Sequence, residues 1–362
     1  TATWDNDNIV LGDHGYLDWT AADAGRSYVF SAGDDALSND IDRIVSTDPE
    51  FGGNDNITTG ALNDIVIGGF GLDVIVAGDG NNLVLGDHGQ ITAAGENAPN
   101  FSTQPITLGL VETIESLIGG SDKITTGIGR DIILGGIDAD VIVANFDEYV
   151  GGLGSDANNI IFGDSGYLDW TAADTGRVYA DATTPLAGTL PGDDQNAMDI
   201  DRVWSTEPDH GGTDSIITGD GNDIIIGGED GEIVTDVIIG VASDVARTVA
   251  ADATGDGDTI DAGQGNNIVF GDNGRITAAT GNAINFIGLP ITLGLVETIE
   301  SLIGGSDKIT TGIGRDIIMG GIDADLIVAN FGEYGFDENL VPAALGSDAN
   351  NIIFGDSGYL DW

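Results

Sequence analysis

Runs of three apolar residues recur along the chain at intervals of nine residues. Between residues 52 and 89 these runs are Ile65–Ile67, Val74–Val76 and Leu83–Leu85, and most of their members are β-branched. β-Branched residues suit strands, and the Gly and Asp residues between the runs suit tight turns. The pattern therefore predicts three-residue strands separated by six-residue turns. Two such nonapeptides would make one coil, and successive parallel coils would stack about 4.8 Å apart.

An acidic residue stands immediately before most of these runs. Asp55, Asp64 and Asp73 lie nine residues apart, and Asn82 occupies the next such position. Stacked coils would place the carboxylates in rows, where like charges at short range disfavour one another's ionisation. Calcium relieves this repulsion because it takes roughly six to eight oxygen ligands from carboxylates and carbonyls. The sequence therefore predicts several calcium ions as ligands.

The residues Gly68–Val76 form a complete copy of the nonapeptide G-G-x-G-x-D-x-U-x, in which U is a large apolar residue. This stretch resembles the repeat-in-toxin (RTX) family of secreted bacterial proteins. The resemblance implies a right-handed parallel β-roll, calcium bound in the turns between coils, and export to a calcium-rich exterior. It also assigns the sixth-position carboxylate to calcium, with turn carbonyls completing the shell. The matching positions are Asp55, Asp64, Asp73, Asp122, Asp131, Asp140, Asp214, Asp223, Asp258, Asp307, Asp316 and Asp325.

Several positions depart from this pattern. An amide replaces the acid at the end of each run, and it would either cap a row of ions or pair in an Asn ladder without metal; these residues are Asn82, Asn159, Asn267 and Asn351. Asp138 and Asp323 replace the fourth-position Gly, so we expect altered turns there. A second candidate set is the acid of each Gly-Asp-x-Gly, for which ligation and simple turn formation both remain open: Asp13, Asp87, Asp164, Asp272 and Asp356.

A closing motif divides the chain into four copies of one unit. It occurs at Asp7–Gly15, Asn81–Gly89, Asn158–Gly166, Asn266–Gly274 and Asn350–Gly358. The predicted organisation is the end of a preceding unit at 1–15, then unit 16–89 with roll 52–89, unit 90–166 with roll 119–166, unit 167–274 with roll 211–274 and an insertion at 234–259, unit 275–358 with roll 304–358, and the start of another unit at 359–362. Because both ends fall inside repeat motifs, we expect a longer parent protein.

The predicted fold class is all-β, a parallel β-roll or irregular β-solenoid whose short nonapeptide runs are joined by extra strands and loops. After each closing motif we expect a strand, a variable excursion and a returning strand such as Ile41–Ser46. We also predict a short helix at Ala242–Ala253 and surface loops at Phe146–Leu153 and Phe331–Leu345.

The outward positions of the later strands are apolar. They include Ile65 and Ile67, Val74 and Val76, Ile132 and Leu134, and Val141 and Val143. Burial of such side chains is worth about 1.5–3 kcal/mol each. We therefore predict that another segment or another protomer covers these faces, which makes self-association a candidate property.

Composition narrows the function. The chain has 61 acidic and 10 basic residues and a net charge of −51, which excludes nucleic acid as a partner and disfavours anionic membranes. Of the acids 49 are Asp, a residue that suits turns and short-reach ligation. A merely solvated surface has no reason to avoid Glu so strongly. There is no cysteine, and no apolar run approaches the roughly 18 residues of a membrane span.

No catalytic motif is evident. The chain has no G-x-S-x-G elbow and no H-E-x-x-H zinc motif, so we expect no enzyme activity. The residues Trp19, Trp170 and Trp362 share one repeat position, for which solenoid packing competes with a patch for glycan or protomer contact.

We expect a calcium-binding structural repeat region of an extracellular or cell-surface bacterial protein, such as an adhesin stalk, surface layer or fibre, that folds on binding calcium. The alternatives are an accessory region of a secreted toxin or hydrolase, and an acidic scaffold for mineral or matrix.

Overall fold

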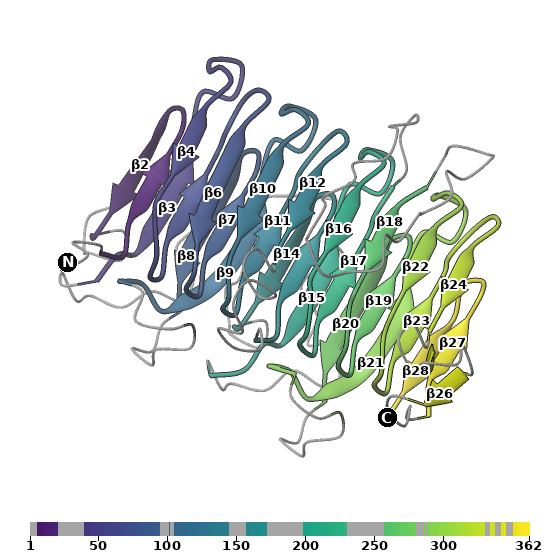
Figure 1. Cartoon of the computed structure of the whole chain (residues 1–362). Helices are drawn as coiled ribbons and strands as arrows, with labels where there is room; N and C mark the ends of the chain where they lie inside the picture. The colour runs from purple at the N-terminus through teal and green to yellow at the C-terminus, as the bar shows by residue number, and fades with distance from the viewer. Residues whose placement is uncertain are drawn as a thin grey trace.

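The computed structural model describes residues 6–20, 40–94, 101, 105–144, 157–171, 198–229, 257–279, 286, 289–329, 334–336, 342–344 and 350–362. These residues form a solenoid whose strands stack side by side from one end of the molecule to the other (Figure 1). The colour in Figure 1 passes from purple to yellow along the stack, so successive coils are added in sequence order along one axis.

Two parallel sheets form the body of the solenoid, and each coil contributes one strand to each. The first, here called the middle sheet, contains in spatial order β1 (Ile9–Leu11), β5 (Ile65–Ile67), β7 (Leu83–Leu85), β11 (Ile132–Leu134), β13 (Ile160–Phe162), β17 (Ile224–Ile226), β19 (Ile268–Phe270), β23 (Ile317–Met319) and β27 (Ile352–Phe354). The second, the outer sheet, contains β4 (Asn56–Thr58), β6 (Val74–Gly78), β10 (Lys123–Thr126), β12 (Val141–Val143), β16 (Ser215–Ile217), β18 (Thr259–Asp261), β22 (Lys308–Thr310) and β24 (Leu326–Val328).

The core between these sheets is built from the middle residue of each three-residue strand. Ile75 of β6 and Ile133 of β11 are fully buried there. Ile124 of β10 pairs in register with Ile75 on one side and with Ile142 on the other. Because side chains alternate between the faces of a strand, this register stacks the middle residues into one continuous apolar row.

A third sheet, the hairpin sheet, is antiparallel throughout. Its strands are, in spatial order, β2 (Gly15–Asp18), β3 (Arg43–Ser46), β8 (Gly89–Ala93), β9 (Leu108–Thr113), β14 (Gly166–Asp169), β15 (Arg202–Ser205), β20 (Gly274–Ala278), β21 (Leu293–Thr298) and β28 (Tyr359–Asp361). Ile91 and Leu168 from this sheet share one hydrophobic cluster with Ile65 and Leu134 of the middle sheet. The hairpin sheet therefore covers the face of the middle sheet that points away from the outer sheet.

This layering confirms the predicted all-β solenoid and one part of the predicted coverage. Ile65 and Leu134 are 0% exposed because hairpins of the same chain lie over them. In the outer sheet Val74 is 38% exposed, so for this position the remaining alternative is coverage by another protomer. The outer sheet is left uncovered because each hairpin follows a middle-sheet strand in the sequence and folds back over the middle sheet. Self-association through the outer sheet stays a prediction.

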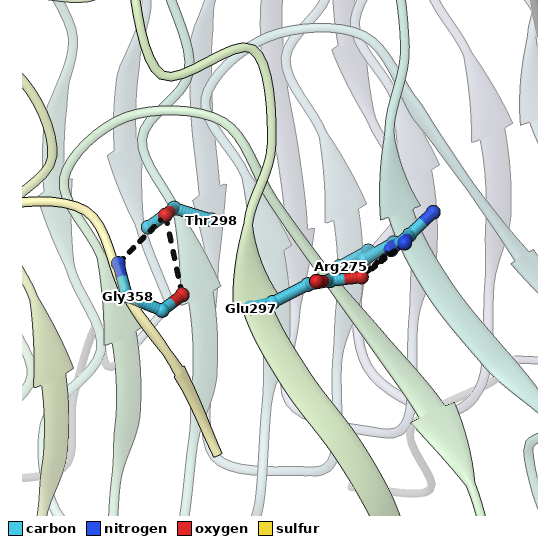
Figure 2. Close-up of polar contacts among 4 residues, drawn as sticks. All are labelled: Arg275, Glu297, Thr298 and Gly358. Carbon is cyan, nitrogen blue, oxygen red and sulfur yellow. Dashed lines mark hydrogen bonds and ion pairs between the residues drawn. The ribbon is translucent and has the colours of Figure 1, made fainter. Parts of the chain in front are cut away.

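A hydroxyl joins each hairpin to the next. Oγ1 of Thr298 accepts the N–H of Gly358 at 3.0 Å and donates to its carbonyl at 3.3 Å (Figure 2). The same double contact joins Thr113 to Gly166, Ser46 to Gly89 and Ser205 to Gly274. Figure 2 also shows the ion pair between Arg275 and Glu297, which are cross-strand partners on β20 and β21. The last residue of one hairpin thus fixes the first glycine of the next.

The aromatic repeat positions pack inside the solenoid and are open at its ends. Trp170 is 2% exposed, whereas its equivalents Trp19 and Trp362 in the end coils are 43% and 46% exposed. The ring of Tyr167 lies 5.9 Å from that of Trp204 on the neighbouring strand. In the interior these residues therefore serve packing.

One predicted loop contains regular structure. Within Phe331–Leu345, β25 (Tyr334–Phe336) and β26 (Pro342–Ala344) form a small antiparallel pair, so the prediction of an irregular loop was wrong there. The alternating residues Tyr334 and Phe336 are of the kind that favours a strand. The predicted helix Ala242–Ala253 and the predicted loop Phe146–Leu153 lie outside the described residues. No helix in the described part of the chain is long and apolar enough to cross a membrane.

Candidate metal sites

The turns of the solenoid lie on two edges. Turns that lead from the middle sheet to the outer sheet, such as Gly68–Asp73, form what we call the aspartate edge. Turns that return from the outer to the middle sheet, such as Ala77–Asn82, form the asparagine edge. The sixth residues of consecutive nonapeptides, nine residues apart, therefore lie on opposite edges. Those of every second nonapeptide, eighteen residues apart within a run, lie on the same edge.

On the aspartate edge every sixth position is an acid, and the acids form one hydrogen-bonded ladder. The backbone N–H of Asp73 donates to Oδ1 of Asp122 at 2.8 Å, and that of Asp122 donates to Oδ1 of Asp140 at 2.7 Å. The ladder runs through Asp55, Asp73, Asp122, Asp140, Asp214, Asp258, Asp307 and Asp325, with distances of 2.7–3.1 Å. These are the sixth-position acids predicted from sequence that the structure brings together.

The second oxygen of these carboxylates faces a space beside a glycine. Oδ2 of Asp73, Asp122 and Asp140 is buried and has no hydrogen-bond partner. A Cβ placed on Gly68 would come within 2.5 Å of Oδ2 of Asp73 and still closer to the carbonyl oxygen of Gly86, the equivalent glycine of the next coil. The same oxygen pair adjoins the first glycine of the other aspartate-edge turns: Gly12, Gly86, Gly135, Gly163, Gly227, Gly271 and Gly320.

The carboxylates of this edge repel one another. Burial, then the charges of Asp55 and Asp13, raise the pKa of Asp73 to about 6, although the N–H of Asp55 opposes the shift. Burial and the charge of Asp73 raise the pKa of Asp122 to about 8. Burial and three neighbouring carboxylates, first that of Asp214, place the pKa of Asp140 well above its ordinary value. The ladder therefore favours either protons or a cation at neutral pH.

These residues fit calcium. Carboxylate and backbone carbonyl oxygens are the ligands that calcium prefers. Beside Gly68 the aspartate edge offers an unpartnered carboxylate oxygen of Asp73 and the carbonyl oxygen of Gly86, which accepts the N–H of Gly69 at 3.0 Å and keeps a second lone pair. No group of three or more His, Asp or Glu side chains among the described residues is arranged to hold a metal by itself. Backbone carbonyls would therefore complete the shell around the ladder carboxylates.

The acids of the Gly-Asp-x-Gly motifs have a different position. Asp87 accepts the N–H of Gly120 at 2.9 Å through Oδ1 and that of Ile137 at 2.7 Å through Oδ2. Asp164 and Asp272 bridge the equivalent pairs of turns, and Asp13 accepts the N–H of Phe70. Asp87, Asp164 and Asp272 thus join the turn that follows their own hairpin to a turn of the next coil, and Asp13 contacts the next coil, as turn-forming acids do. Among them, the charge of Asp87 also raises the pKa of Asp140.

On the asparagine edge acids and amides alternate in one row. Oδ1 of Asn82 accepts the N–H of Asp64 at 3.1 Å, and the N–H of Asn82 donates to Oδ1 of Asp131 at 2.8 Å. The row contains Asn8, Asp64, Asn82, Asp131, Asn159, Asp223, Asn267, Asp316 and Asn351. The four sixth-position acids of this edge are therefore apart from the ladder of the aspartate edge.

The turns in which Asp replaces the fourth glycine keep a left-handed residue. Asp138 has φ of 68° and Asp323 of 67°, whereas Gly71 at the equivalent position has φ of 124°. Asp tolerates the left-handed helical region but not the more extended one that Gly71 adopts. The predicted alteration of these turns is therefore present in the backbone.

Comparison with known families agrees with this geometry. The model of the RTX calcium-binding nonapeptide repeat (4 copies) matches residues 51–87, 118–148, 210–234, 252–275 and 303–333. The chain carries RTX repeats. Repeats of this kind bind calcium and are typical of secreted bacterial proteins. The matched segments contain most of the described turns between the middle and outer sheets and leave nearly all of the hairpin sheet outside. Searches of curated proteins and of solved structures found no significant match.

Sequence reasoning missed the carbonyl of the first turn glycine and the division of the acids between two edges. A signal for both was present. The turn begins with Gly on the aspartate edge, as at Gly68 and Gly135, but with Thr or Ala on the asparagine edge, as at Thr126 and Ala77.

Proposed function

We propose that this RTX repeat region is a structural segment of an extracellular or cell-surface bacterial protein, such as an adhesin stalk, surface layer or fibre, and that calcium controls its folding. The observation that supports this role is the continuity of the two parallel sheets. Strands from all four sequence units follow one another in sequence order along the same middle and outer sheets in the described residues. At about 4.8 Å per strand, nine middle-sheet strands span about 40 Å. The units thus form one rod.

Calcium would supply the positive charge that the aspartate edge lacks. The chain's own part is to hold Asp73, Asp122 and Asp140 one above another and to exclude water from their second oxygens, which are buried. The unfolded chain spreads these acids apart and holds no such row. Because binding then favours the folded state, each site adds about 2.7 kcal/mol at a calcium concentration 100-fold above its dissociation constant.

The histidines support a structural rather than a catalytic role. A ring nitrogen of His14 lies 3.1 Å from the carbonyl oxygen of Phe51, and one of His88 lies 3.1 Å from that of Pro49. His14 thus joins the closing turn of the preceding unit to backbone of unit 16–89, and His88 joins its turn to backbone of its own unit. Burial lowers the pKa of His88, which favours the neutral imidazole.

Circular dichroism and small-angle X-ray scattering of the whole chain test the proposal. With calcium we expect a β-rich spectrum and the scattering of a rod. After transfer to chelator we expect a disordered spectrum and a larger radius of gyration. Magnesium at equal concentration is the control, because it demands tighter octahedral geometry and retains its waters. A chain that is equally folded with calcium and with chelator would refute the proposal.

A further inference from the structure

The two edges of the solenoid differ in a second turn position that varies together with the sixth. On the aspartate edge the first turn residue is glycine and the sixth is always an acid. On the asparagine edge the acid is accompanied by threonine five residues earlier, in the pairs Thr59 and Asp64, Thr126 and Asp131, Thr218 and Asp223, and Thr311 and Asp316. The amide is accompanied by alanine, as in Ala77 with Asn82 and Ala262 with Asn267, and the two longer turns also begin with Ala144 and Ala329.

In the alanine turns the side-chain amide takes the contacts that a cation would make. Nδ2 of Asn82 donates to the carbonyl of Gly78 at 3.0 Å and to that of Gly80 at 3.2 Å, while its Oδ1 accepts the N–H of Asp64. Nδ2 of Asn351 donates to the carbonyl of Ala329 at 2.9 Å. The carbonyl of Gly78 also accepts the N–H of Gly127 at 2.8 Å, so both of its lone pairs are occupied, whereas the carbonyl of Gly86 on the aspartate edge accepts the N–H of Gly69 and keeps one lone pair.

In the threonine turns a hydroxyl can replace a cation by donating a hydrogen bond to the acid. Oγ1 of Thr311 donates to Oδ2 of Asp316 at 2.7 Å, and Asp316 also accepts the N–H of Asn267 through Oδ1. Both oxygens of this carboxylate thus have donors from the chain. The hydroxyls of Thr126 and Thr218 are buried in the equivalent turns, without a hydrogen-bond partner, five residues before an acid. The rotamer of Thr311 would direct each to the acid of its own turn. In the first threonine turn Thr59 donates instead to the carbonyl of Ala77 at 3.3 Å, and Oδ2 of Asp64 is buried without a hydrogen-bond partner.

Charge separates the edges further. Along the asparagine edge an acid occurs only in every second coil. Arg130 and Arg315 each stand immediately before one of these acids, with their guanidinium groups over the rings of Phe101 and Phe286 at 4.7 and 5.3 Å. The aspartate edge has an acid in every coil from Asp55 to Asp325.

We propose that calcium binds along the aspartate edge alone, and that the asparagine edge is a metal-free row in which Asn amides and Thr hydroxyls replace the cations. This inference rests on the proposed calcium-dependent function and divides the sixth-position acids into two sets. Asp64, Asp131, Asp223 and Asp316 are structural, although the nonapeptide pattern predicts them as ligands.

The native chain supplies the substitution that tests this. Each threonine turn is changed into an alanine turn by the paired substitutions T59A/D64N, T126A/D131N, T218A/D223N and T311A/D316N, made together. The calcium bound per chain is measured by equilibrium dialysis with elemental analysis, and folding by circular dichroism during a calcium titration. We expect the fourfold variant to bind as many ions as the unmodified chain. The matched control is Asp122→Asn on the aspartate edge, nine residues before Asp131, for which we expect loss of bound ions and a higher calcium midpoint.

Each outcome has a distinct meaning. Loss of ions in the fourfold variant would show that the asparagine edge binds calcium and would overturn the inference. Should that variant not fold, the single swap T126A/D131N compared with Asp122→Asn decides the question by the same ion count. An unmodified chain that binds no calcium would refute the proposed function instead.

Discussion

Oδ1 of Asn82 accepts the backbone N–H of Asp64 across neighbouring coils of the asparagine edge, at 3.1 Å. An amide and an acid thus occupy the same position in successive coils, and the hydrogen bond needs no charge on either. On the other edge the equivalent bond, from Asp55 to Asp73 at 2.7 Å, joins two acids. Calcium removal should therefore act on one edge of the solenoid first.

The first prediction concerns the space beside the turn glycines. In Gly135→Ala the new Cβ would overlap Oδ2 of Asp140 and the carbonyl oxygen of Gly163. Overpacking of this kind costs about 1–3 kcal/mol, and the methyl group would occupy the place proposed for the ion. We expect a lower melting temperature in calcium and fewer bound ions. Gly53→Ala is the control, because a Cβ there meets nothing within 4 Å. Equal effects of the two substitutions would contradict the prediction.

The second prediction is a pH dependence without calcium. The pKa values of Asp73 and Asp325 rise to about 6 and that of Asp122 to about 8, from an ordinary value of 3.8, with burial as the main cause. The folded chain therefore holds these protons more tightly than the unfolded chain does. Its stability is greatest at low pH and is lost as the pH rises through 6 and then 8.

Thermal unfolding in calcium-free buffers between pH 5 and pH 8 measures this dependence. The lower limit stays above the isoelectric point of about 4.1. We expect the melting temperature to fall over this range, and to become nearly independent of pH when calcium is in excess. A rise in stability with pH in calcium-free buffer would show that the aspartate edge is not the dominant set of titrating groups.

The third prediction separates packing from recognition at the aromatic positions. Trp170→Ala removes a side chain that is 2% exposed and should cost about 3–5 kcal/mol. Trp19→Ala changes the equivalent residue, which is 43% exposed, and should cost far less. Chemical denaturation in calcium measures both. Similar losses would mean that exposure in the end coils does not reflect the contribution of this residue to folding.

The fourth prediction compares the two outward faces of the solenoid. Leu134 is fully buried under the hairpin sheet, so Leu134→Ala should cost about 2–5 kcal/mol. Val74 holds an outward position of the outer sheet and is 38% exposed, so Val74→Ala should have a small effect. If Val74→Ala also proved strongly destabilising in concentrated protein but not in dilute protein, a second protomer would cover the outer sheet.

Much of this arrangement could be predicted from the sequence, because the nine-residue period sets the positions of the strands, the turns and the acids together. The runs around Val74 and Ile132, the row of acids and the returning strand near Ile41 all follow from local patterns. The hairpin sheet was less accessible, because its strands β3 and β8 belong to different units and pair only when coils stack. Likewise, the sequence left open whether Asn82 caps a row of ions or pairs in an Asn ladder without metal, and its place in a mixed row was not predicted. It lies inside such a row, because its neighbours Asp64 and Asp131 come 18 residues before and 49 after it.

The ladder of the aspartate edge has a further consequence. Its successive members are 18, 49, 18, 74, 44, 49 and 18 residues apart in sequence, yet each step closes with a hydrogen bond of 2.7–3.1 Å. The spacing of the ladder therefore depends on the stacking of the coils and not on the number of residues between them. A coding sequence for a foreign epitope or a small domain could be grafted between Asp164 and Asp214, where the chain already accommodates the longest detour, without displacing a single rung. The architecture is in this sense a display scaffold, on which evolution or an engineer can vary the cargo independently of the frame.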